Sequence, residues 1–91
     1  MKNIECYYKD GSLIFCTTQE YPYNTANKIL NVFNLLGLNS TVREKSQDQF
    51  NVVGHLQVNY DPFIHQEKKW KDVIFQLKRT KDLLETKMKS F

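Results

Sequence analysis

The sequence has few cysteines and no long apolar run. Its two cysteines, Cys6 and Cys16, are too few among 91 residues for a disulfide scaffold. No apolar stretch approaches the roughly 18 residues that a membrane span requires. The first residues, "MKNIECYY", lack the apolar segment of a secretory signal. We therefore expect a cytoplasmic protein that does not enter a membrane.

Motifs that hold cofactors, metals or catalytic nucleophiles are also missing. The glycines at 11, 37 and 54 are too scattered to form a phosphate-binding loop. The histidines, His55 and His65, have no partner at zinc-ligand spacing. No serine lies in a G-x-S-x-G elbow. The sequence therefore predicts a protein without cofactor, metal or small-molecule substrate, and not an enzyme.

The composition is that of a small packed domain. Apolar residues make up 41% of the chain and aromatic residues 13%, which favours a globular fold over disorder. A chain of 91 residues fits one domain, residues 1–91. The net charge is +3, too small to imply a nucleic-acid partner by itself. Residues 63–91 hold eight Lys or Arg against four Asp or Glu, so the positive charge lies near the C-terminus.

The stretch "YYKDGSLIF", residues 7–15, predicts a β-hairpin. Asp10-Gly11 is a strong signal for a two-residue turn, which places Lys9 opposite Ser12. Alternation then assigns an apolar face to Ile4, Cys6, Tyr8, Leu13, Phe15 and Thr17. The other face receives Glu5, Tyr7, Lys9, Ser12, Ile14 and Cys16, with Tyr7 opposite Ile14. The two thiols lie on opposite faces, so we expect no disulfide.

A helix is predicted between Asn24, as N-cap, and Gly37, as the residue that stops it. Its buried stripe has helical spacing and consists of Ala26, Ile29, Leu30, Phe33 and Leu36.

A second hairpin is predicted over residues 40–60. The clearest alternation in the chain occurs in "FNVVGHLQVNY". One face holds Phe50, Val52, Gly54, Leu56, Val58 and Tyr60. The other holds Asn51, Val53, His55, Gln57 and Asn59.

The last predicted helix begins with Asp61 as N-cap and Pro62 at the first helical position, and nothing interrupts it before Phe91. One narrow arc of this helix contains Trp70, Val73, Ile74, Leu77, Leu84, Met88 and Phe91. About thirty residues would span ~45 Å, whereas a globule of this size is roughly 30 Å across. We therefore expect the helix to extend beyond the core, which leaves Leu84, Met88 and Phe91 for a partner.

The predicted fold is α+β with element order ββαββα and a long C-terminal helix. The simplest packing joins the two antiparallel β-hairpins into one four-stranded sheet with both helices on one face. The alternative is a hairpin and helix exchanged between two chains.

With both helices on one side, the other side of the sheet is left open. We expect a polar face there, with candidate binding residues Tyr7, Lys9, Arg43, Lys45 and His55. Cations can follow phosphates and a tyrosine can stack on a base, as in RNA or single-stranded DNA binding. An ordinary solvated sheet face would have the same pattern. If His55 met Glu5 or Arg43, the cluster could instead serve a small ribonuclease.

Three functions follow from these features. The first hypothesis is a small non-catalytic protein that inhibits or adapts another protein, or binds a second copy of itself, through the C-terminal helix. Compact Lys- and Asn-rich domains of this kind are typical of viral or mobile-element accessory proteins. The second is an RNA or single-stranded DNA binding domain that uses the open sheet face. The third is the small ribonuclease.

Overall fold

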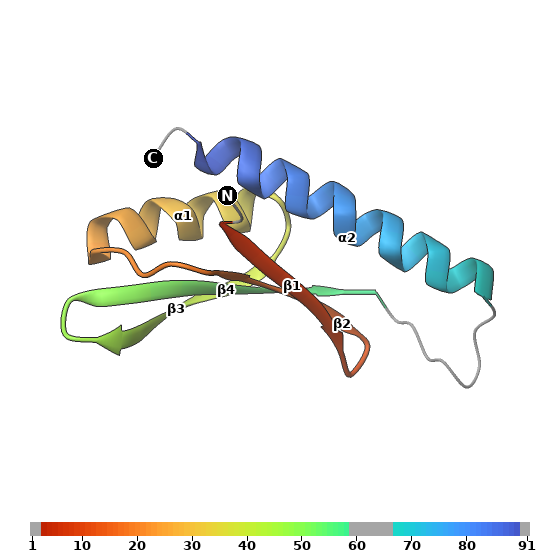
Figure 1. The fold of residues 1–91 in the computed structure, drawn as a ribbon, viewed down its shortest axis with the longest axis horizontal. Helices are drawn as coiled ribbons and strands as arrows, with labels where there is room; N and C mark the ends of the chain where they lie inside the picture. The colour runs from red at the N-terminus through yellow and green to blue at the C-terminus, as the bar shows by residue number, and fades with distance from the viewer. Residues whose placement is uncertain (1–2, 59–66, 90–91) are drawn as a thin grey trace.

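Six elements follow one another in the order that the sequence predicts (Figure 1). The structure is a computed structural model, and it describes residues 3–58 and 67–89. The elements are β1 (Ile4–Lys9), β2 (Ser12–Thr17), α1 (Tyr23–Leu35), β3 (Asn39–Ser46), β4 (Gln49–Gln57) and α2 (Glu67–Met88). The predicted α+β class and ββαββα order are confirmed.

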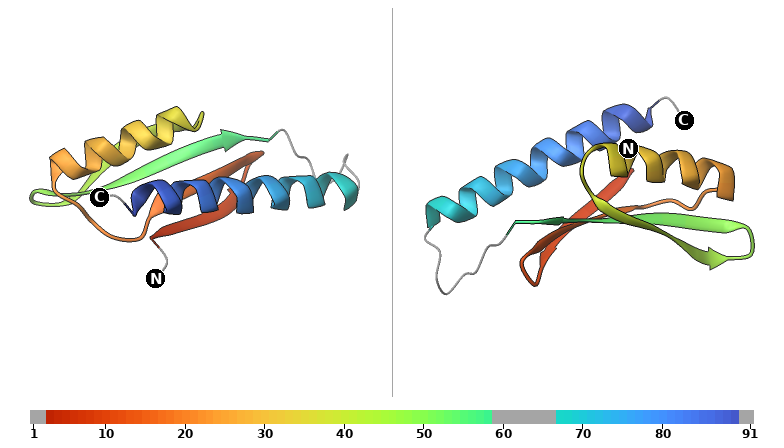
Figure 2. Two further views of the ribbon diagram at one scale, coloured as in Figure 1. Left: turned by 90° about the horizontal axis from the view of Figure 1, so that it is seen from above. Right: turned by 180° about the vertical axis from the view of Figure 1, so that it is seen from behind.

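The four strands form one antiparallel sheet in the order β1-β2-β4-β3. The sheet closes within one chain because β2 pairs with β4. The backbone N–H of Val52 donates to the Thr17 hydroxyl at 3.1 Å, and this buried bond joins the two hairpins beyond the last ladder pair. Both helices lie on the same face, α2 over β1 and α1 over β3 and β4 (Figures 1 and 2). None of the helices and strands in residues 3–58 and 67–89 covers the opposite face.

The first hairpin has the predicted turn and register. Asp10 and Gly11 have φ angles of 51° and 81°, as a type I′ turn requires, and Lys9 pairs with Ser12. The backbone N–H of Gly11 also donates to the Tyr8 hydroxyl at 3.1 Å, which holds the tyrosine beside the turn. Both cysteines are free thiols.

Helix α1 begins two residues earlier than predicted. Pro22, not Asn24, is the N-cap, and the prediction of Asn24 is wrong. Pro22 has extended backbone (φ −59°, ψ 157°), and its carbonyl oxygen already accepts a bond from Ala26 N–H at 2.9 Å. Asn24 therefore lies inside the first turn, where its own backbone is helical.

The C-terminal end of α1 is the predicted one. Gly37 has φ 83°, a conformation that favours glycine, and its N–H donates to the Asn34 carbonyl at 3.0 Å. Leu38 N–H donates to the Phe33 carbonyl at 3.1 Å. These two bonds form a Schellman motif, which satisfies the last carbonyls of the helix and turns the chain into β3.

The second hairpin has the predicted faces over the residues that are described. Its turn is Gln47–Asp48, and β3 has a bulge between Glu44 and Ser46. Val52 is fully buried on the covered face, and Gly54 beside it lets α1 approach closely. A Cβ at Gly54 would lie 2.7 Å from Phe33 Cδ2. The predicted Asn59 and Tyr60 lie outside the described residues.

The end of α2 packs on the core, so the expectation of a partner-facing stripe there is wrong. Leu84 is 0% exposed and Met88 is 5% exposed, both within the main apolar cluster. The last turns of the helix lie beside α1 and over the sheet (Figure 2), because the helix crosses the sheet with its C-terminal half inward. Phe91 and the predicted start at Asp61-Pro62 lie outside the described residues.

The other half of α2 also contacts the core. Val73 is buried, and the Trp70 ring meets the Tyr8 ring edge to face, with centroids 5.7 Å apart. The predicted apolar arc of this helix is therefore its packing surface, and it is used along the whole described length.

Candidate functional site

The face of the sheet opposite the helices, called the open face below, is covered by none of the described elements. Pairing and alternation assign it Glu5, Tyr7, Lys9, Ser12, Ile14, Cys16, Asn39, Thr41, Arg43, Asn51, Val53, His55 and Gln57. These residues come from all four strands, so the face exists only once β2 and β4 have paired.

One row crosses the middle of the open face. Directly opposed residues place Tyr7, Ile14, His55 and Asn39 side by side, one from each strand. Tyr7 is 48% exposed, and His55 is exposed as well. Two strand spacings separate them, which is about 10 Å. The row therefore presents an aromatic ring and an imidazole ring on either side of an isoleucine.

The floor of the open face is apolar. Ile14 is 6% exposed and Val53 is 7% exposed, although no helix lies over them. Cross-strand neighbours cover them, because directly opposed side chains in antiparallel pairs lie within contact distance. An apolar floor beneath exposed rings is a surface on which a planar group can lie.

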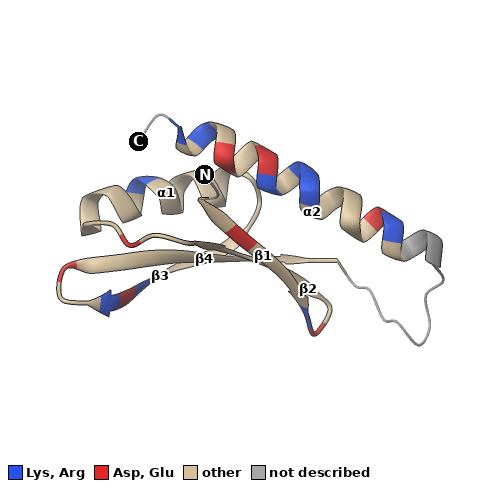
Figure 3. Cartoon of the chain, in the orientation of Figure 1, with Lys and Arg blue, Asp and Glu red and all other residues tan. Residues whose placement is uncertain are grey.

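Positive charges lie at the two ends of this face. Lys9 is beside the β1–β2 turn, in a row with Ser12 and Gln57. Arg43 lies toward the end of β3, opposite Asn51, and Lys45 follows it at the bulge. Figure 3 shows basic residues at both ends of the sheet. Six residues of β4 separate the two ends, roughly 20 Å.

Arg43 is held in place by a buried partner. Its Nε donates to Asn51 Oδ1 at 3.4 Å, and Asn51 is buried. This bond uses one of the five guanidinium N–H groups. The remaining donors of an exposed guanidinium can contact an anionic ligand.

The pKa of the Cys16 thiol depends on burial and on charged side chains around it. Burial raises the pKa of its thiol, the Arg43 and Lys45 charges oppose that shift, and the Glu5 carboxylate adds to it. The raised pKa keeps the thiol protonated at neutral pH, so Cys16 is not an activated nucleophile.

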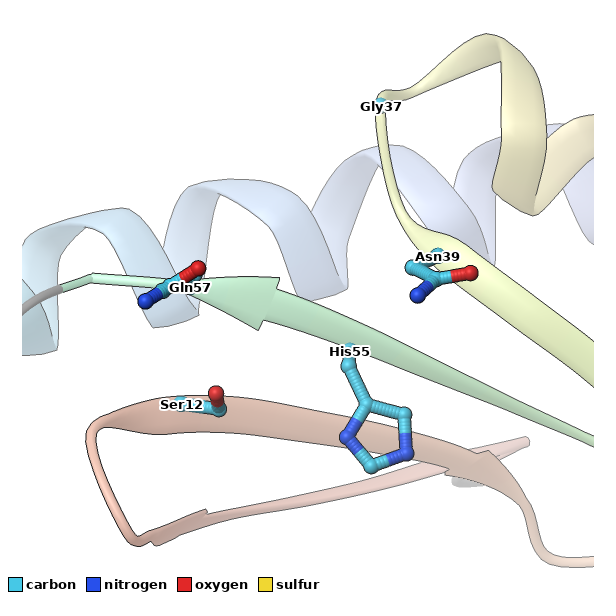
Figure 4. A pocket seen from close by; sticks show the side chains of 5 residues that line it. All are labelled: Ser12, Gly37, Asn39, His55 and Gln57. Atoms are coloured by element: carbon cyan, nitrogen blue, oxygen red, sulfur yellow. The ribbon is translucent and has the colours of Figure 1, made fainter.

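A polar hollow lies at one corner of the open face (Figure 4). Its volume is about 480 Å³, and its lining consists of Ser12, Gly37, Asn39, His55 and Gln57. Figure 4 looks onto the open face with the helices behind it, and the Asn39 and Gln57 amides lie on either side of His55. The imidazole ring is seen nearly face-on, so its flat side points outward. The volume lies within the ~300–1,000 Å³ of small-ligand sites.

The catalytic cluster considered for a ribonuclease does not form in this structure. Glu5 lies in the next row and is separated from His55 by strand β2. Arg43 is opposite Asn51, four residues along β4 from His55, which is about 13 Å. The expectation that His55 meets Glu5 or Arg43 is therefore wrong, because pleat and register place them in different rows.

The outward side of α2 is mixed in character. Phe75 is 67% exposed and Leu83 is 41% exposed. Lys, Arg, Asp and Glu alternate around them (Figure 3), as in a solvated helix face. Neither helix, within the described residues, is long and apolar enough to cross a membrane. Across the same residues no three His, Cys, Asp or Glu side chains gather as metal ligands would.

Sequence reasoning identified part of the open face. Tyr7, Lys9, Arg43 and His55 lie on it, and Lys45 lies at the bulge of β3, where no pair assigns it to a face. The sequence does not indicate the hollow, because its pattern marks Gly37 only as a helix stop and leaves Asn39 outside the predicted hairpin of residues 40–60. The signal that could have found it is the β2–β4 pairing, which brings Ser12 and Gln57 together.

The chain matches no protein-family model, and searches of the curated proteins and of the solved structures return no significant match.

Proposed function

We propose that the protein is a non-catalytic binding protein that takes single-stranded RNA or DNA on the open face of its sheet. The observation that supports this most directly is the central row, in which exposed Tyr7 and His55 flank an apolar floor at Ile14. Single-stranded bases can be splayed out and stacked on tyrosine and histidine rings, whereas paired bases cannot.

The charge distribution supports the same partner. Lys9 lies at one end of the face and Arg43 and Lys45 at the other, so phosphates on both sides of the stacked bases meet a cation. In the paired rows of this face Lys9 and Arg43 are basic and Glu5 is acidic, while exposed Asp10 and Glu44 are sequence neighbours of the two cations. A chain with alternating bases and phosphates is complementary to rings in the middle and cations at the ends.

The test is fluorescence anisotropy with labelled twelve-nucleotide RNA and DNA of mixed sequence. We expect the double variant Tyr7→Ala, Arg43→Ala to weaken binding about tenfold or more, because one stacked base alone contributes ~1–3 kcal/mol. Three phosphate contacts predict that log K falls with log salt with a slope of about −2 for a single strand.

A matched control is available on the other side of the molecule. The variant Phe75→Ala, Arg79→Ala also removes an exposed aromatic ring and an arginine, but from α2. It should leave the affinity unchanged. Loss of affinity in this control with none in the open-face variant would assign binding to α2 and refute the proposed face. No binding by the wild-type protein at low salt would refute the function.

A protein partner, as an inhibitor or adaptor would have, is the second candidate. The observation that favours it is the exposure of Phe75 and Leu83 on the outward side of α2. Light scattering tests the case in which the partner is a second copy. A dimer that dissociates in Phe75→Asp would support this candidate, and a monomeric wild-type protein would exclude self-association.

A further inference from the structure

The polar hollow at the corner of the open face has a lining that fits one kind of base. Two side-chain amides, Asn39 from β3 and Gln57 from β4, stand on either side of His55 (Figure 4). Their positions are diagonal cross-strand neighbours, typically ~7–8 Å apart. Both are exposed, so their amides can turn toward a ligand.

A side-chain amide places a donor and an acceptor next to each other. It therefore pairs with a base edge that presents an acceptor beside a donor. Gln57 already takes part in an interaction within the protein. A side-chain amide has two N–H donors and two lone pairs, so it can form further hydrogen bonds with a ligand. Two amides on opposite sides of a hollow require a base with two such edges.

Adenine has two edges of this kind. Its N6 amino group lies between N7 on one edge and N1 on the other, and Asn or Gln pairs with N6 and N7 in the known readout of adenine. Guanine presents two acceptors, N7 and O6, on the corresponding edge, which suits Arg or Lys. Among the described residues, no Lys or Arg lines the hollow, and Lys9 lies one strand away from Ser12 in the same row. Cytosine and uracil offer only one edge, so only one amide would be used.

The ring of His55 supplies the stacking surface. In Figure 4 the ring extends from β4 toward β2, beside the line that joins the two amides, and a base lying on it would reach toward them. Gly37 brings no side chain to the rim, and a Cβ built there would meet no atom within 4 Å. The hollow is therefore open on that side, where the sugar and phosphate would leave.

We infer that this hollow binds an adenine base of a single-stranded nucleic acid, with Asn39 and Gln57 reading its two edges and His55 stacking on it. The inference rests on the proposed function, because the rest of the strand would be held by Tyr7 and the cations of the same face. It adds sequence preference to a surface that would otherwise bind any base.

The experiment compares twelve-nucleotide RNAs of adenosine, cytidine and uridine by anisotropy at one salt concentration. We expect the adenosine oligomer to bind about tenfold tighter than the other two. Asn39→Ala should lower that preference to about twofold, and Gln57→Ala should lower it similarly. Thr41→Ala, the next residue of β3 on the same face but outside the hollow, is the matched control and should leave the preference intact.

An oligomer of 7-deazaadenosine tests the second edge separately, because it lacks the N7 acceptor and keeps N1 and N6. We expect it to bind several-fold more weakly than the adenosine oligomer in wild type.

The outcomes separate the inference from the proposed function. Equal affinity for the three oligomers, with binding still lost in Tyr7→Ala, Arg43→Ala, would overturn the adenine site and leave the open face as the binding surface. An adenosine preference that survives both amide substitutions would show that the hollow does not read the base. No binding of any oligomer would overturn both.

Discussion

The two faces of the sheet are built from alternate residues of the same four strands, yet they bury their side chains in different ways. On the covered face, Leu13 and Phe15 are fully buried because two helices close over them. On the open face, Ile14 between them is nearly as buried, but only its neighbours in the sheet cover it. Consecutive residues of β2 are therefore buried in two different ways, by the helices on one face and by neighbouring strands on the other.

This difference separates stability from binding. Helix-covered residues cannot move without opening the core, whereas the exposed rings and cations of the open face contact neighbouring strands but no helix. Substitutions at Tyr7 or Arg43 should therefore change binding and leave the fold, and substitutions below the helices should do the reverse. The predictions below test this separation, beginning with the largest expected effect.

The largest effect is expected under α2. Leu84→Ala should lower the free energy of unfolding by ~2–5 kcal/mol, because it leaves a cavity in the core. Leu83→Ala, next to it but 41% exposed, should cost about 0.5 kcal/mol or less. Urea denaturation of the two variants measures both values. Equal losses would mean that the helix end is not packed as described.

The next effect compares the two faces within β2. Leu13→Ala should cost ~2–5 kcal/mol, while Ile14→Ala should cost about 2 kcal/mol or less, because long neighbours and water can fill an open-face gap. The same denaturation experiment provides the comparison. If Ile14→Ala costs as much as Leu13→Ala, burial by neighbouring strands is as rigid as burial by helices, and the separation of stability from binding fails.

A smaller effect is expected where α1 meets β4. Gly54→Ala should destabilise by ~1–3 kcal/mol, because its methyl group would lie against Phe33 and the Ser40 hydroxyl. Phe33→Leu should cost less in the Gly54→Ala background than in the wild type, since it removes part of the clash. A double-mutant cycle measures this coupling, and strictly additive losses would contradict the close approach.

The smallest effect concerns thiol chemistry on the open face. Because burial raises the pKa of Cys16, its alkylation by iodoacetamide at pH 8 should be slower than that of a free thiol. Glu5→Gln should speed the reaction, since the carboxylate raises that pKa, and Arg43→Gln should slow it, since the guanidinium lowers it. Peptide mass spectrometry measures the rates. Rates that do not change with either substitution would place these charges away from Cys16.

Local patterns were sufficient for the elements and for most of their faces. The Asp10-Gly11 pair specified a turn with two positive φ angles, and period-two alternation sorted both hairpins correctly. Gly37 ended α1 as expected. These features depend on contacts between residues close in the chain, so the sequence alone was enough to predict them.

Local patterns failed where two distant segments meet. The apolar arc of α2 correctly identified a packing surface, but the position of the helix along the sheet depends on what α1 and β1 leave uncovered. Leu84 and Met88 were therefore assigned to a partner when they belong to the core. The sequence did not indicate Pro22 as the N-cap of α1, because Pro22 has no side chain that can cap a helix and only its carbonyl accepts the first helical bond.

By itself, the sequence determined that this chain makes two hairpins and two helices, which residues of each strand share a face, and that Tyr7 and His55 avoid the core. Only the tertiary structure decided that β2 pairs with β4, with Ile14 opposite His55. That pairing joins residues some forty positions apart, and no local turn or period specifies it. The common apolar face beneath two helices selects it, and the row across the open face follows from it.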